Sequence, residues 1–298
     1  MVDSPPQLPD AVSAPREQID GRAGPLSYYV AGVGKPLLLL HSINAAASAY
    51  EMRPLFEGLR QRFRVFLPDL PGFGFSDRSR RYYDPRLYTD AVHDMLNAIE
   101  ASGETSPVRA VALSLSSEFL ARAVTERPDR FDNVCLITPT GFTRGSDRLR
   151  EAGKTRELPG FAAVFEFPLW RRAMFRLLTR RSVIRYFLRR TYGRSEVDED
   201  MVDYDYLTAH QPGAENAPFA FLSGRLFSRD IRDVYERLQL RVWVPHATRG
   251  DFKDFRGAQW THDRPNWRVE PFDSGALVHY EQPEMFLKSY LDFAEGSA

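Results

Sequence analysis

Short apolar runs alternate with amphipathic stretches along most of the chain. The amphipathic stretches place apolar residues at helical spacing, around residues 50–60, 86–101, 119–124 and 228–238. The apolar runs have the composition of buried strands; they are LSYYVAG (26–32), PLLLLHS (36–42), FRVFLPD (63–69), VRAVAL (108–113), NVCLITPTGF (133–142), LRVWVPH (240–246) and WRVEPFD (267–273). Strands that alternate with helices predict an α/β protein with a mainly parallel sheet and right-handed crossovers.

Two parts of the chain break this alternation. Residues 1–21 are rich in proline and polar residues, and we expect them to form an arm laid over the surface. Residues 143–228 are polar and helical, which predicts a helical segment inserted into a core made of residues 22–142 and 229–298.

The inserted segment has an arginine-rich centre. Residues 168–194 contain nine arginines and no acidic residue, and apolar residues recur there with the spacing of a helix pair that buries one face. One interpretation is a surface that touches anionic lipid or an acyl substrate, which requires a contiguous exposed apolar face. The favoured alternative is that these arginines face water and the acidic stretch EVDEDMVDYD (196–205) that follows.

Composition excludes some classes of protein. The 298 residues include 40 Lys+Arg and 40 Asp+Glu, so the net charge gives no reason to expect nucleic acid as a partner. The single cysteine, Cys135, cannot form an internal disulfide, which favours a reducing, cytoplasmic location. No metal-ligand cluster or phosphate-binding loop is evident, so we expect no cofactor. The sequence gives no indication of the oligomeric state.

The stretch VRAVALSLSSEFLARA (108–123) predicts a strand that turns directly into a helix. The turn falls at Ser114, where a strained backbone would require small residues two positions away, and Ala112 and Ser116 are small. Such a turn would expose the Ser114 hydroxyl and leave the Leu115 N–H free to bind an oxyanion. The alternative is that Ser114 only caps a helix.

Three segments resemble the α/β-hydrolase superfamily, in particular its capped, esterase- and dehalogenase-like branch. They are ALSLS (112–116), which is similar to the nucleophile elbow G-x-S-x-G, the segment PDLPGFGFSD (68–77), and SGALVHYEQPE (274–284), which is similar to the histidine segment G-H-x-x-H-x-E-x-P-E. The resemblance covers residues 22–142 and 230–296. It implies a mostly parallel eight-stranded sheet, with a helical cap inserted after the sixth strand and covering the nucleophile.

The resemblance also implies further site residues. The segment HSINA (41–45) corresponds to the H-G loop of the family, so Ile43 would supply the second oxyanion-binding N–H, and Asn44 could add a side-chain donor. Trp170 of the inserted segment is our expected substrate contact. The alternative for His41 and Asn44 is an ordinary strand end and turn.

The catalytic histidine and acid depart from the family pattern. Ala276 stands at the histidine position, and His279 matches the second, usually non-catalytic, histidine. We expect His279 to act as the base and Asp251, with Asp254 behind it, as the acid that orients it. His246 or His41 could reach the site instead, or the protein could bind a ligand without turning it over.

The sequence therefore predicts a serine hydrolase of a small ester, thioester or related acyl compound. Ser114 would attack, and Leu115 and Ile43 would hold the oxyanion. A dehalogenase mechanism is disfavoured because it needs a carboxylate at Ser114. The alternative is a catalytically impaired family member that binds a small apolar ligand under the cap.

Overall fold

The fold is built on one eight-stranded sheet with the order β1-β2-β4-β3-β5-β6-β7-β8. A computed structural model describes residues 5–145, 150–158, 160, 167 and 169–296. The strands are β1 (Arg16–Gly21), β2 (Gly24–Ala31), β3 (Pro36–Leu40), β4 (Arg64–Pro68), β5 (Val108–Leu113), β6 (Phe131–Ile137), β7 (Arg241–Ala247) and β8 (Trp267–Phe272). Only the pairings of β2 with β1 and β4 are antiparallel, and all the others are parallel. The predicted α/β architecture with a mostly parallel eight-stranded sheet is confirmed.

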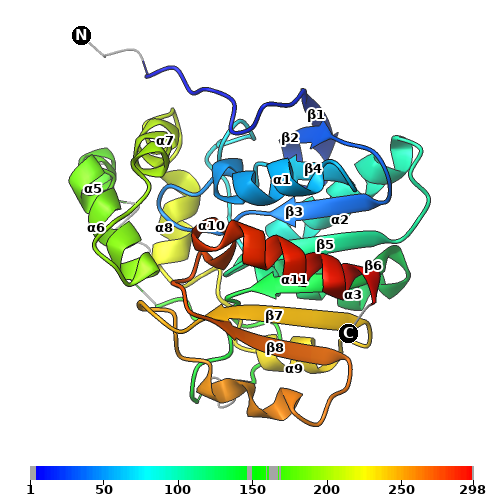
Figure 1. Ribbon diagram of the computed structural model, residues 1–298. Coiled ribbons are helices and arrows are strands. Elements are labelled where there is room, and N and C mark those ends of the chain that lie inside the picture. The colour runs from blue at the N-terminus through cyan, green and yellow to red at the C-terminus, as the bar shows by residue number, and fades with distance from the viewer. Residues whose placement is uncertain (1–4, 146–149, 159, 161–166, 168, 297–298) are drawn as a thin grey trace.

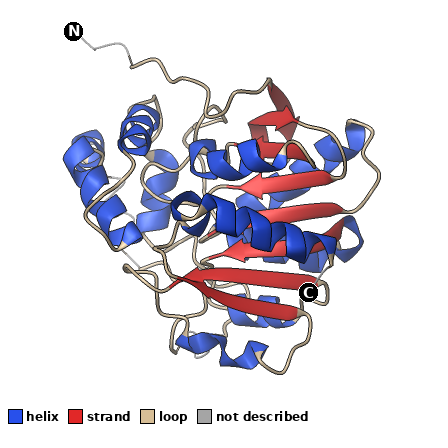
Figure 2. Ribbon diagram, in the orientation of Figure 1, coloured by secondary structure: helices blue, strands red, loops and turns tan. Residues whose placement is uncertain are grey.

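Helices cover both faces of the sheet (Figures 1 and 2). One face packs against α1 (Arg53–Leu59) and α11 (Pro283–Glu295), and the other against α2 (Pro85–Ala101), α3 (Ser116–Glu126) and α9 (Ile231–Glu236). The leucines of β3 alternate between the two cores, since Leu37 and Leu39 join the first and Leu38 and Leu40 the second. Burial on both faces explains why this strand is a continuous apolar run.

The N-terminal arm is shorter than predicted. Residues 16–21 form β1, which pairs with β2 at the edge of the sheet. The sequence REQIDG is almost wholly exposed and lacks a buried face, so no alternation of apolar residues marked it as a strand. The preceding residues do lie over the surface: Tyr204 donates a hydrogen bond to the Pro9 carbonyl, and Gln211 donates one to the Pro6 carbonyl.

The described residues between β6 and α9 (Ile231–Glu236) form four α-helices. They are α5 (Arg171–Leu178), α6 (Arg181–Tyr192), α7 (Glu199–Ala209) and α8 (Asn216–Leu222), and we call them the inserted helices. They lie at the end of the molecule toward which the parallel strands point (Figures 1 and 2). Phe175 of α5 and Phe219 of α8 pack there with Ala46, which follows β3. Functional sites of parallel sheets form at the carboxyl ends of the strands, so the inserted helices lie over the expected position.

The loop after β4 holds the carboxyl end of the sheet together. The Asp69 carboxylate accepts hydrogen bonds from the backbone N–H groups of Ala49 and Phe75, at 2.9 Å each. Ser76 donates to the Asp69 carbonyl and accepts from the Ser27 N–H. These hydrogen bonds hold the loop 69–77 in place. The single cysteine, Cys135, is buried in β6 between β5 and β7, and burial raises the pKa of its thiol.

Candidate active site

Ser114 lies at a sharp turn between β5 and α3. Its φ angle is 55°, in the left-handed region that residues other than glycine rarely adopt. The turn is held because the Ser114 N–H donates to the Ile137 carbonyl at 2.9 Å and the Ser117 N–H donates to the Ser114 carbonyl at 3.1 Å. The residue is partly exposed, and its hydroxyl makes no hydrogen bond with any residue that the structure describes. Ser114 therefore does not act as a helix cap through its side chain.

The residues flanking Ser114 join this turn to the loop after β3. Leu40 of β3 is the register partner of Ala112 of β5, so the segments that follow these two strands leave the sheet side by side. Ser116, buried at the start of α3, donates a hydrogen bond from its hydroxyl to the His41 carbonyl. A glycine at position 116 could not make this contact, which gives the departure from G-x-S-x-G a structural reason.

The backbone N–H groups of Leu115 and Ile43 remain available. Leu115 directly precedes α3, and neither its N–H nor that of Ile43 donates to an acceptor in the described part of the chain. Paired N–H groups beside a helix start can bind a developing oxyanion. The oxyanion-binding role of Leu115 and Ile43 stays a prediction.

The prediction that Asn44 donates to a substrate is wrong in this structure. The Asn44 amide donates to Ser42 Oγ at 3.0 Å and to Glu51 Oε1 at 2.8 Å, and its oxygen accepts from the Ala46 N–H. An amide nitrogen has two hydrogens, so both are used within the loop.

A buried carboxylate that sequence reasoning missed completes this network. Glu51 Oε2 accepts from the Ser42 N–H at 2.8 Å, and Oε1 accepts from the Ser42 hydroxyl at 2.9 Å. Burial raises the pKa of Glu51 to about 6, although these hydrogen bonds oppose the shift. The signal in the sequence is the serine at position 42, where the family has glycine, because a buried hydroxyl needs a partner. Nothing local pointed to Glu51 as that partner.

Two of the histidines considered as bases are held in structural contacts. His41 Nδ1 donates to the Ser42 carbonyl at 2.6 Å, and its Nε2 accepts from the Leu70 N–H at 2.9 Å. His246 stacks on Phe255 with ring centroids 4.1 Å apart, and its Nδ1 donates to the Ala247 carbonyl. Neither ring makes a hydrogen bond to Ser114.

The predicted pair of His279 and Asp251 does not form. His279 is completely buried, and its Nε2 donates to the Glu51 carbonyl at 2.8 Å, while Nδ1 has no partner among the described residues. Burial lowers the pKa of His279 to about 4. Asp251 is exposed and accepts from Arg190 Nε at 2.5 Å. The structure therefore corrects both the role of Asp251 as orienting acid and the expectation that His279 contacts Ser114. Asp254, the second choice for the orienting acid, accepts hydrogen bonds from the Arg256 side chain.

The C-terminal end of α6 lies against both loops that the family uses for the acid and the histidine. The Asp251 N–H donates to the Arg190 carbonyl, and the Ala276 N–H donates to the Thr191 carbonyl at 3.0 Å. A Cβ atom on Gly250 would lie 2.6 Å from the Arg190 carbonyl oxygen, and one on Gly275 would lie 2.3 Å from that of Thr191. Backbone contacts with α6 thus take up the space beside these two glycines.

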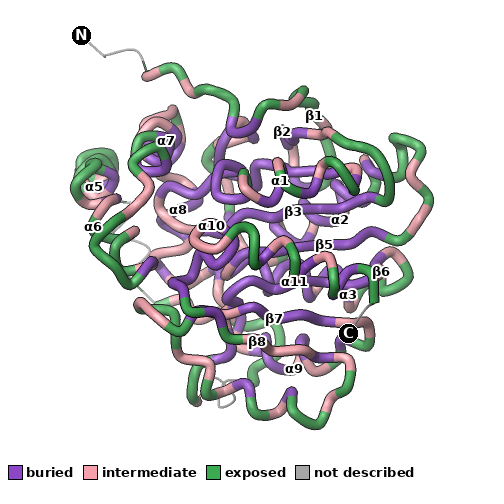
Figure 3. Tube along the Cα trace, in the orientation of Figure 1, coloured by how far each residue is buried: buried purple, intermediate pink, exposed green. Residues whose placement is uncertain are grey.

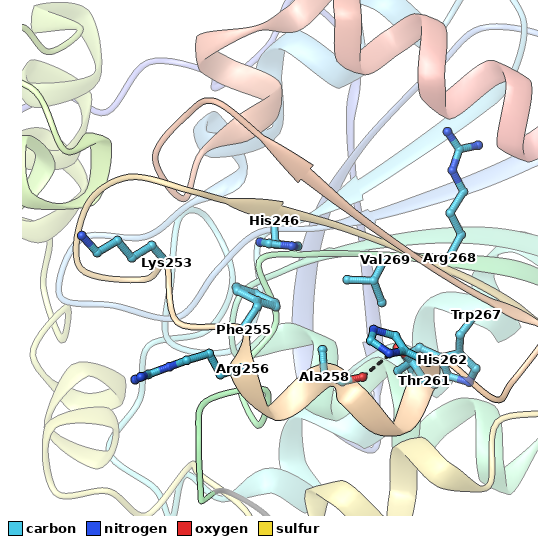
Figure 4. A pocket seen from close by; sticks show the side chains of 10 residues that line it. All are labelled: His246, Lys253, Phe255, Arg256, Ala258, Thr261, His262, Trp267, Arg268 and Val269. Carbon is cyan, nitrogen blue, oxygen red and sulfur yellow. Dashed lines mark hydrogen bonds between the residues drawn. The ribbon is translucent and has the colours of Figure 1, made fainter.

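Trp170 and the cavities are not brought together with Ser114. Trp170 is exposed just before α5, and its ring is tilted by 34° against that of Phe167 with ring centroids 4.4 Å apart, which does not support its predicted substrate contact. A cavity of about 690 Å³ near β7 and β8 is lined by His246, Phe255 and Trp267, among others, and not by Ser114 (Figure 4). Between the loop 45–47 and α7 there is a void of only about 10 Å³, which is room for about one water.

The comparisons with known proteins agree with this architecture. A family model described as the alpha/beta hydrolase fold matches residues 35–194. The chain belongs to the alpha/beta hydrolase fold family. This match includes the Ser114 turn, the loop after β3 and the helices α5 and α6.

Individual relatives of this alpha/beta hydrolase family protein are distant. An uncharacterized protein of Mycobacterium tuberculosis (strain ATCC 25618 / H37Rv) is 28% identical over 118 residues, which are 40% of this chain and 33% of that protein. The uncharacterized hydrolase YugF of Bacillus subtilis (strain 168) is 23% identical over 158 residues, 53% of this chain and 52% of that one. The chain thus spans about a third to a half of the length of these relatives.

Solved structures share the fold over nearly the whole chain. A serine hydrolase involved in carbazole degradation, the CarC enzyme, has a TM-score of 0.75 at 15% identity, covering 95% of this chain and 99% of that one. At this identity the likeness shows the fold alone, and the chemistry has to be argued from the residues of the site.

Proposed function

We propose that the protein is a serine hydrolase of a small ester, thioester or related acyl compound, with Ser114 as nucleophile and the inserted helices as a cap. The observation that carries this proposal is the strained turn at Ser114. A residue with a φ of 55° and a partly exposed, unbonded hydroxyl is costly to keep unless the geometry is used. The free N–H groups of Leu115 and Ile43 support it, because an acyl transfer needs donors for the oxyanion.

In this proposal Ser42 and Glu51 replace the missing histidine and acid. Ser42 lies two residues beyond Leu40, as Ser114 lies two beyond its partner Ala112, and neighbouring strands are about 5 Å apart. The Ser42 hydroxyl donates to Glu51 Oε1 and has a lone pair left to accept another proton. With a pKa of about 6, Glu51 is ionised at neutral pH and able to take a proton.

The proposed reaction has two steps. Ser114 Oγ attacks the carbonyl carbon, its proton moves to Ser42 Oγ, and the Ser42 proton moves to Glu51. The leaving group departs with that proton, which leaves an acyl-Ser114 ester. Water then attacks the ester and gives up a proton to Glu51 by the same route. That proton returns to Ser114 Oγ as the bond between the acyl carbon and Oγ breaks, which releases the acid and restores the free enzyme.

The test is hydrolysis of p-nitrophenyl acetate together with labelling by a fluorophosphonate. We expect Ser114→Ala to lose labelling and turnover, Glu51→Gln to lower kcat/KM about 100-fold, and His279→Gln to leave kcat/KM unchanged. A loss of function in the matched control Ser182→Ala, an exposed serine of α6, would contradict the assignment of Ser114.

The pH dependence tests the proton acceptor separately. Because Glu51 must be ionised, kcat/KM should fall about tenfold per pH unit below about pH 6 and be flat above it. Glu51→Gln should abolish this fall in kcat/KM at acidic pH. If kcat/KM of Glu51→Gln still falls in the same way, another group takes the proton.

A second candidate function is ligand binding without turnover. It is favoured by the contacts of α6, because Ala276 stands where the resemblance places the histidine and the Ala276 N–H donates a hydrogen bond to the Thr191 carbonyl of α6. Folded protein that is neither labelled nor active on short esters would support this candidate and exclude the hydrolase.

A further inference from the structure

Helices α5 and α6, with the residues just before α5, carry many exposed apolar side chains. Leu169 is 84% exposed, Leu177 51% and Phe187 54%, and together with Phe167, Trp170 and Tyr186 they make up six of the eleven large apolar residues that are exposed in the described part of the chain. We call these six residues the apolar patch. No helix within the described ranges is long and apolar enough to cross a bilayer.

Arginines surround the apolar patch, and only some of them are neutralised. Arg181 pairs with Asp203 and Arg185 with Glu199, as the interpretation of a solvated, acid-paired surface predicts. The exposed side chains of Arg176 and Arg180 pair with no carboxylate among the described residues. Arg172 is also exposed, and its contact with Glu215 is long, at 3.8 Å. A net positive charge therefore remains on α5.

The apolar patch lies where a large flat partner could reach it. Both helices lie at one end of the molecule, and their traces are mostly exposed in Figure 3. The exposed residues Trp170, which directly precedes α5, and Ala173 and Leu177 within α5 follow one another at helical spacing. Arg172 and Arg176 lie beside them in the sequence. This is an apolar stripe bordered by cations.

We propose that α5 and α6 bind the surface of an anionic lipid bilayer. Leucine and aromatic side chains enter the boundary between headgroups and acyl chains, and arginines bind lipid phosphates. A second copy of this chain is the less suitable occupant, because a symmetric contact would bring the unpaired arginines of the two copies together. The whole chain has no net charge, so the attraction comes from this surface and not from the protein as a whole. The proposal does not depend on the chemistry at Ser114.

The test is flotation of the full-length protein with vesicles. One set contains phosphatidylcholine alone, and the other contains phosphatidylcholine and phosphatidylglycerol at about 7:3. We expect the protein to float with the anionic vesicles and to stay behind with the neutral ones. Because exposed charges are screened over a few ångströms at high ionic strength, about 0.5 M salt should lower the bound fraction several-fold.

Two variants separate the apolar and charged contributions. Leu169→Gln/Leu177→Gln/Phe187→Gln and Arg172→Glu/Arg176→Glu/Arg180→Glu should each lower partitioning at least tenfold. The control Val33→Gln/Met285→Gln, which removes exposed apolar residues elsewhere, should bind like the unaltered chain. Equal flotation with both vesicle types, no flotation at all, or a concentration-dependent dimer that Leu177→Gln abolishes would each overturn the proposal.

Discussion

The serine at position 42 and the carboxylate of Glu51 depend on each other. The Ser42 hydroxyl needs an acceptor in the interior, and Glu51 needs donors to be tolerated there. The consequence reaches Asn44, whose amide completes the network and is thereby lost as a substrate donor. Ser42, at a position where the resemblance places glycine, thus joins Glu51 and Asn44 in one hydrogen-bond network.

Buried histidines should make the protein acid-sensitive. Burial lowers the pKa of His41 and His279 from 6.5 to about 4, so the unfolded chain binds more protons between these pH values. The contribution of these two neutral histidines to the free energy of unfolding is fully present above pH 6.5 and is lost as the pH falls toward 4. Each histidine should lower the free energy of unfolding by about 2 kcal/mol between pH 7 and pH 5. Glu51, whose pKa is raised, acts in the opposite direction between pH 6 and 4.5.

The variant His279→Gln tests this at a single residue. Glutamine can still donate to the Glu51 carbonyl but does not titrate, so the loss between pH 7 and pH 5 should shrink by about 2 kcal/mol. Urea denaturation at the two pH values measures it. An unchanged difference would mean that His279 is protonated equally in the folded and unfolded chains.

At the scale of the element, α6 is fixed to the core by backbone contacts. Its last turn approaches Gly250 and Gly275, and the approach is closer than any side chain would allow. The sequence could not predict this, because the pairing joins parts of the chain more than 50 residues apart through main-chain atoms, which leave no residue pattern. The predicted contact between His279 and Asp251 does not form, because each side chain binds a partner that is far away in the sequence.

A matched pair of glycine substitutions measures this contact. Gly250 and Gly103 both have positive φ angles, but a Cβ on Gly103 would meet nothing within 4 Å. Gly103→Ala should cost only the backbone strain, about 1 kcal/mol. Gly250→Ala should cost about 2–4 kcal/mol, because the strain adds to a steric clash. Chemical denaturation measures both, and equal losses would contradict the close approach of α6.

At the scale of the whole molecule, the architecture followed from the alternation of apolar runs and amphipathic stretches. The buried strands could be predicted because their residues are apolar, as Leu37 to Leu40 of β3 show. β1 was not predicted because its side chains are exposed and its stability comes from pairing with β2. The turn at Ser114 was predictable since it is local, whereas the partners of Glu51, His279 and Asp251 are set by tertiary contacts.

The N-terminal residues connect the core to the inserted helices. The Ala11 N–H donates to the Tyr29 hydroxyl of β2, and α7 donates from Tyr204 to the Pro9 carbonyl. Removal of residues 1–9 should therefore loosen α7 while leaving α11 unaffected. Hydrogen exchange should increase at least tenfold for amides of α7. Equal exchange of α7 with and without these residues would show that the arm contributes nothing to its docking.

The position of the lone thiol has a practical consequence. Cys135 lies in an interior strand, and its raised pKa disfavours the thiolate that reagents attack. Alkylation must then wait until β6 separates from its neighbours, so the rate of modification in an excess of reagent reports how often the central sheet opens. Cys135 is thus a natural probe of sheet opening, and no engineered cysteine is needed.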